Sequence, residues 1–134
     1  MKTEMMTIYE ANSIYLPFFA FILGGLGYGS MEILFRGFTH WSMCITGGAC
    51  ILTFYFLYSY LNSISLISAA FLGATIITIY EFFVGIIVNL WFQWNVWDYS
   101  LLPGNVLGQI CPQFFLIWVG LCFIFFGAIK IINF

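Results

Sequence analysis

Charged side chains are scarce in this sequence. Its 134 residues include three Lys and Arg, five Asp and Glu and one His, and 63% of them are hydrophobic. A soluble domain carries roughly 25% charged residues, whereas this chain has 6%. Too little polar surface is left to cover a globule in water. The composition therefore predicts an integral membrane protein, and this length predicts one compact bundle without a second domain.

Basic patches and cysteine pairs are missing as well. Without a cluster of Lys and Arg, nucleic-acid binding is excluded. No C-x-x-C spacing occurs among the four cysteines, Cys44, Cys50, Cys111 and Cys122. We interpret these as small buried hydrophobic residues, with a Cys44–Cys111 bridge as an open alternative. The sequence predicts no cofactor.

The apolar residues are arranged in four long segments. About 20 consecutive apolar residues form a helix that spans the hydrocarbon core of a bilayer. We predict an all-α integral membrane protein, residues 1–134 forming a single transmembrane domain. Its four transmembrane helices are expected at about 15–35, 44–61, 66–92 and 110–132.

Four crossings put both termini on the same side of the membrane. Lys2 and Lys130 lie on that side and Arg36 on the other, which favours cytoplasmic termini. Both halves consist of a helix, an intramembrane acid, an aromatic polar loop and a second helix, so two pseudo-repeated hairpins are an open interpretation. The small-residue spacing of Gly25 and Gly29 allows close helix packing, and a homodimer is also open.

One acid lies inside an otherwise apolar helix. Glu81 occurs within the segment TIITIYEFFVGIIVNLW, where an ionised residue costs roughly 2.5–3.5 kcal/mol on insertion scales. Thr78, Gly85 and Asn89 follow the same stripe of this helix at three- and four-residue spacing,. We therefore expect the stripe to face the interior of the bundle.

The remaining polar residues suggest a site near the same membrane leaflet. On the four-helix topology Glu32, Arg36, His40 and Asp98 lie at the outer face, and Glu81 lies in the outer half of its helix. The predicted substrate- or ion-binding residues are Glu81, Arg36, Glu32, Asp98, His40, Asn89, Tyr99 and Asn105. In one interpretation they bind an ion or small molecule, or exchange protons. In the other, Arg36 neutralises Glu81 or Glu32 and only holds the helices together.

Metal binding and catalysis have weaker support. No His lies three or four residues from an acid on one helix face, as a metal site would favour, and no nucleophile motif accompanies Glu81 and Asp98. We therefore predict no metal ligand and no catalytic residue.

The second half of the chain carries motifs of a known family. In order, these are Gly73-Ala74, Thr78, Glu81, Gly85, Trp97-Asp98-Tyr99-Ser100, Pro103, Asn105, Gly108, Ile110-Cys111 and Trp118. They resemble the CmpB-like bacterial membrane family called Putative ABC-transporter type IV. In the first half, Glu32 and Arg36-Gly37-Phe38 resemble the family's helical acid and Arg-Gly-Phe loop. Phe35 replaces an Asn of the family pattern, and the segment THWSMCITGG replaces its Gly-Pro loop.

The resemblance covers residues 20–126 and implies a permease of the bacterial cytoplasmic membrane. We expect a small polytopic permease with a polar intramembrane pocket around Glu81 and Arg36, which binds an unidentified small molecule or ion. No Walker motif occurs in the sequence, so any ATP that is used must bind to another protein. The alternative is a non-catalytic scaffold or accessory subunit.

Overall fold

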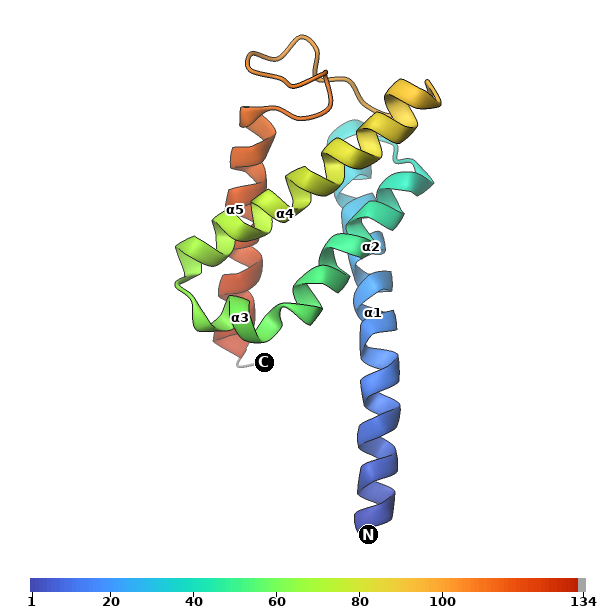
Figure 1. The fold of residues 1–134 in the computed structure, drawn as a ribbon, viewed down its shortest axis with the longest axis vertical. Helices are drawn as coiled ribbons and strands as arrows, with labels where there is room; N and C mark the ends of the chain where they lie inside the picture. Colours follow the sequence, from blue (N-terminus) through green and yellow to red (C-terminus); the bar gives the residue numbers. More distant parts are fainter. Residues whose placement is uncertain (133–134) are drawn as a thin grey trace. The chain divides into compact units, whose positions relative to one another are not determined.

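The computed structural model describes residues 1–132, with the side chains of 6–13 left out. In this part of the chain the regular structure is helical (Figure 1). The exception is an isolated antiparallel bridge between Val106 and Ile110. The prediction of an all-α fold is confirmed. The elements are α1 (Lys2–Arg36), α2 (Trp41–Phe56), α3 (Tyr58–Ser63), α4 (Leu66–Gly85), the π-helix η1 (Ile86–Trp91) and α5 (Pro112–Ile132).

Three helical segments are long and apolar enough to cross a membrane. They are Ile14–Arg36, Leu66–Trp91 and Pro112–Ile132, and they match the first, third and fourth predicted spans. The chain is therefore a multi-pass helical membrane protein. Its first helix begins earlier than predicted, at Lys2, and contains Pro17.

The second predicted span is divided into two helices. We expected one helix over 44–61, but the chain leaves helical geometry at Leu57 (φ −93°, ψ 7°), between α2 and α3. At about 1.5 Å per residue, the 16 residues of α2 reach about 24 Å, less than the roughly 30 Å of a hydrocarbon core. Near the break, the Thr53 hydroxyl donates to the Ala49 carbonyl (2.8 Å), a contact that bends helices.

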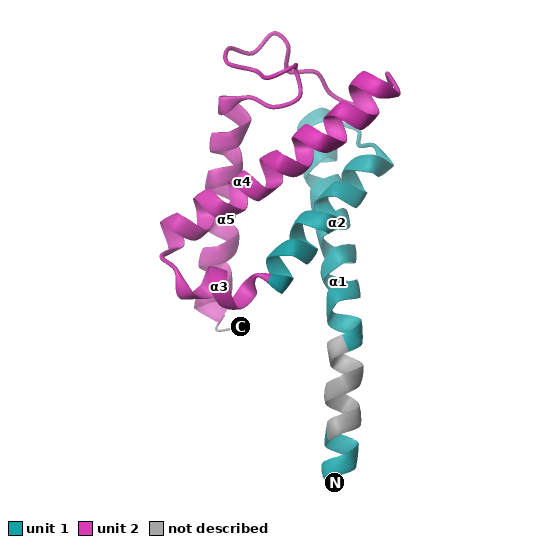
Figure 2. Cartoon of the chain, viewed as in Figure 1, with its two compact units in different colours: residues 1–56 teal, residues 57–134 magenta. Residues whose placement is uncertain are grey.

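The chain divides into two compact units, residues 1–56 and 57–134 (Figure 2). Unit 1 contains α1 and α2. Unit 2 contains α3, α4, η1, the loop 92–111 and α5. The boundary coincides with the break at Leu57.

Glycines let the two helices of unit 1 approach closely. A Cβ added to Gly24 would lie 2.5 Å from the Gly47 carbonyl oxygen and 2.7 Å from the Ile51 Cβ. A Cβ on Gly25 would lie 2.9 Å from the Cys44 carbonyl oxygen. The two backbones thus touch at a distance that a side chain would prevent, as small-residue spacing in lipid allows.

Unit 2 is built on the pairing of α4 with α5. A Cβ on Gly73 would lie 2.8 Å from the Phe126 ring and 2.9 Å from the Cys122 Sγ. At the start of α4, Ser65 caps the helix by accepting from the Ser68 N–H (3.2 Å). The cap fixes where α4 begins, and the contacts of Gly73 bring α4, the helix that contains Glu81, close to α5.

The cysteines are thiols. Cys50, Cys111 and Cys122 are buried, and Cys44 is partly exposed. The Cys44–Cys111 bridge that the sequence left open is not formed, because all four are free.

Candidate functional site

The predicted binding residues fall in both units. Unit 1 contains Glu32, Arg36 and His40, and unit 2 contains Glu81, Asn89, Asp98, Tyr99 and Asn105. Each unit forms its own contacts, and every one of the eight side chains has a partner within its own unit.

Glu81 is held inside unit 2. Its side chain is 2% exposed, and its Oε2 accepts a hydrogen bond from the Trp118 indole Nε1 of α5 (3.1 Å). The expectation that this acid faces an interior is confirmed by its burial. An indole N–H can only donate, so it orients the carboxyl oxygen without adding a charge.

Trp118 was not among the predicted site residues. In the sequence it is recognisable only as a family position in the last helix. A usable signal was present, because a buried indole N–H must find an acceptor and Glu81 is the one acid inside an apolar helix of this half. Sequence spacing alone could not show that the two helices bring these residues together.

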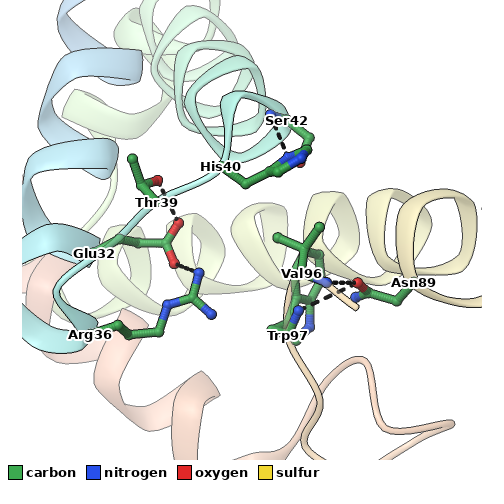
Figure 3. Close-up of polar contacts among 8 residues, drawn as sticks. All are labelled: Glu32, Arg36, Thr39, His40, Ser42, Asn89, Val96 and Trp97. Atoms are coloured by element: carbon green, nitrogen blue, oxygen red, sulfur yellow. Dashed lines mark hydrogen bonds and ion pairs between the residues drawn. The ribbon is translucent and has the colours of Figure 1, made fainter. Parts of the chain in front are cut away.

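Glu32 and Arg36 form an ion pair one turn apart at the end of α1 (Figure 3). Their side chains are 15% and 29% exposed. The Thr39 hydroxyl donates to Glu32 Oε1 (3.1 Å), and the Arg36 guanidinium lies 4.5 Å from the centroid of the Phe38 ring. Of the two acids considered as partners of Arg36, the structure therefore pairs it with Glu32.

His40 caps the start of α2. Its Nδ1 accepts from the Ser42 backbone N–H (3.2 Å) and lies 2.6 Å from the Ser42 hydroxyl (Figure 3). A backbone N–H only donates, so the proton of the neutral ring is on Nε2. The side chain thus satisfies one of the donors that a helix leaves unpaired at its beginning.

Asn89 fastens the π-helix to the loop that follows. Its Oδ1 accepts from the backbone N–H of Val96 (2.7 Å) (Figure 3), and its Nδ2 donates to Gln109 Oε1 (2.8 Å). The Gln109 carbonyl accepts from the Trp97 indole (3.0 Å). A Cβ on Gly85 would lie 2.5 Å from Gln109 Oε1, so only glycine leaves room for this amide. Gln109, 3% exposed, was missed because an isolated Gln carries no motif.

Asp98 and Asn105 shape the loop from within. Asp98 Oδ1 accepts from the Ser100 N–H (2.9 Å), the side-chain turn that Asp commonly forms. Asn105 donates to the Leu102 carbonyl (2.9 Å) and accepts from the Gly108 N–H (2.9 Å). Gly108 has a φ of 72°, a left-handed conformation that glycine adopts without strain.

Tyr99 packs against the beginning of α5. Its ring stacks on that of Phe114, with centroids 4.5 Å apart and planes 13° apart, and its backbone N–H donates to the Gly108 carbonyl (2.7 Å). The segment Trp97–Ser100 thus joins the loop to both of its flanking helices. Within the described residues, no group of three or more His, Cys, Asp or Glu side chains could hold a metal ion.

The family model described as Putative ABC-transporter type IV matches residues 14–133. The matched region covers most of both units and every predicted site residue. No curated protein and no solved structure matches the chain.

Proposed function

This chain belongs to the Putative ABC-transporter type IV family, and on that premise we propose that it is a small membrane permease whose ligand binds at Glu81. The observation that carries the proposal is the burial of Glu81 in a helix of membrane length. Glu81 is 2% exposed and lies in the segment Leu66–Trp91. Ionisable residues at such positions are costly and mark substrate, ion or proton pathways.

The contact with Trp118 supports a binding role. Binding a cation or exchanging a proton requires a carboxylate held in one orientation by its surroundings. The Trp118 indole holds Oε2 in this way (3.1 Å) and leaves the net charge of the acid unchanged. The ligand class favoured by this arrangement is a cation, a cationic small molecule or a proton.

Glu81→Gln tests this proposal. An amide keeps a carbonyl oxygen for Trp118 but cannot carry a negative charge, so the protein should insert and fold while binding or transport is lost. A stability screen in nanodiscs would use ions, nucleosides, amino acids and lipid headgroups, because a ligand that binds only the folded state raises its apparent stability. Carbodiimide labelling of Glu81, with protection by the ligand, gives a second readout.

Glu32→Gln is the matched control, since it removes an acid that already has an ion-pair partner in Arg36. We expect the stabilising ligand to act on wild type and on Glu32→Gln, and to have no effect on Glu81→Gln. Unchanged ligand response in Glu81→Gln would contradict the proposal.

An accessory or scaffold subunit is the second candidate function. This function is favoured because other polar side chains already have partners within their own unit. Arg36 forms an ion pair with Glu32, and Asn89 forms a hydrogen bond with Gln109. In this case Glu81 would serve only to join α4 to α5. No ligand of the screen would then shift the stability of wild type, and co-purification from the native membrane should recover a partner subunit.

The finer topology is also proposed. We infer four crossings with both termini in the bacterial cytoplasm, because α2 and α3 together cover residues 41–63 with a break only at Leu57. Each unit contains one packed helix pair, which supports a repeat of two hairpins. We further propose a homodimer that recruits a separate nucleotide-binding protein if transport uses ATP.

A further inference from the structure

Three aromatic rings form a stack at the end of η1. Trp91 and Phe92 have ring centroids 5.9 Å apart with planes 8° apart, and Phe92 and Trp94 have centroids 4.9 Å apart with planes 16° apart. Their exposed fractions are 76%, 53% and 44%. The stack is therefore a largely exposed group of apolar rings on unit 2.

The backbone is shaped to form this stack. Gln93 and Asn95, on either side of Trp94, have φ values of 57° and 51°, a left-handed conformation that non-glycine residues seldom adopt. The Trp94 N–H donates to the Val88 carbonyl (2.8 Å), which folds the chain back on η1. Strained residues of this kind point to a functional constraint, and here the result is that the ring of Trp94 returns onto Phe92.

The residues around the stack have the composition expected at the boundary between the hydrocarbon core and the lipid headgroups. The candidate span Leu66–Trp91 ends in the stack itself, so the exposed rings continue the surface of a helix that faces lipid. No charged residue occurs between Glu81 and Asp98. Trp rings combine an apolar body with one N–H donor and concentrate at the headgroup level of bilayers,.

We propose that the stack of Trp91, Phe92 and Trp94 is seated among the lipid headgroups and fixes the depth of the α4–η1 helix. Glu81 is ten residues before Trp91, a distance of at most about 15 Å along the axis, the length these residues would have in a regular α-helix. A hydrocarbon core is roughly 30 Å thick. The anchored stack thus places Glu81 within the hydrocarbon core, in the half nearer the stack.

The test compares wild type with the double variant Trp91→Phe/Trp94→Phe in phosphatidylcholine and phosphatidylglycerol vesicles. Phe keeps three stacked rings, so the fold is retained, and the fluorescence lost on substitution belongs to the two indoles of the stack. Spin-labelled lipids with the label near the headgroup or at the chain end quench Trp emission at different depths. Trp118→Phe supplies the reference. The emission lost on this substitution, compared with wild type, belongs to the indole that is hydrogen-bonded to Glu81.

The difference emission of the stack should lose most of its intensity to the headgroup-level label, whereas that of Trp118 should respond more to the chain-end label. Two results would overturn the proposal. Quenching of the stack by acrylamide without any response to lipid labels would place the rings in water or against a non-lipid partner. Stronger quenching by the chain-end label would place them in the hydrocarbon core.

Discussion

At the residue scale, the hydrogen bond from Trp118 orients the carboxyl group of Glu81. Its donor, the Trp118 N–H, is neutral and fixed by the packing of α5 on α4. A buried acceptor that loses such a donor keeps its desolvation cost, whereas replacing both partners by apolar groups is nearly neutral. The two kinds of substitution therefore separate the structural role of the pair from its binding role.

Trp118→Phe removes the donor and keeps an aromatic ring at the same place. We expect it to lower the free energy of unfolding by about 1–3 kcal/mol, since a buried oxygen loses its hydrogen bond. Thermal unfolding in nanodiscs measures the change. Adding Glu81→Leu should recover much of the loss. A double variant no more stable than Trp118→Phe would contradict the assigned bond.

Asp98 tests whether the loop residues act through charge or through hydrogen bonds. Asp98→Asn keeps an oxygen for the Ser100 N–H, so its stability should match that of wild type. Asp98→Ala should lose about 0.5–1.5 kcal/mol, the usual worth of one hydrogen bond. If Asp98→Asn instead abolishes ligand binding at unchanged stability, Asp98 contributes its charge to the site, as the sequence analysis predicted.

At the scale of the elements, how closely two helices pack depends on where their glycines lie. In α1, Gly24 faces the Gly47 carbonyl oxygen at a distance that excludes a Cβ, whereas a Cβ on Gly27 would meet no atom within 4 Å. The same helix thus offers a packed and an open glycine one turn apart, which makes a matched pair of substitutions.

Gly24→Ala should destabilise unit 1 by about 1–3 kcal/mol, because the added methyl group forces the helices apart. Gly27→Ala should be neutral or stabilise the helix by up to about 1 kcal/mol, the difference in helix propensity between the two residues. Thermal unfolding of both variants in the same detergent checks this. Equal effects at the two positions would show that α1 does not pack on α2 through Gly24.

The number of membrane crossings is decided at the scale of the whole molecule. Three segments are long enough to cross, while α2 is short and is followed by a break. If α2 and α3 together cross the membrane, both termini lie on the same side of it. If they do not cross, the termini lie on opposite sides.

Single cysteines in a cysteine-free background distinguish these topologies. Thr3→Cys, Asn62→Cys and Ile132→Cys should react with a membrane-impermeant thiol reagent from the same side of oriented vesicles, and Leu101→Cys from the other. Leu101 is 97% exposed, so its reactivity reports the side of the loop 92–111. Labelling of Leu101→Cys and Thr3→Cys from one side would show three crossings instead.

The sequence by itself determined the class of the molecule. Hydropathy and charge content are sums over neighbouring residues, so they correctly predicted a helical membrane protein and the spans within α1, α4 and α5. The family motifs were likewise readable without coordinates. Burial of Glu81 followed from the cost of exposing an acid to lipid.

Only the tertiary structure decided which donor reaches Glu81, because the Trp118 indole comes from another helix. The ion pair of Glu32 with Arg36 is different, since four-residue spacing on one helix already favours it,. The contact of Asn89 with Gln109 again depends on the tertiary structure, since the two amides lie twenty residues apart in the sequence. The break at Leu57 was not predictable either, because no Pro or Gly marks it and local apolarity continues through it.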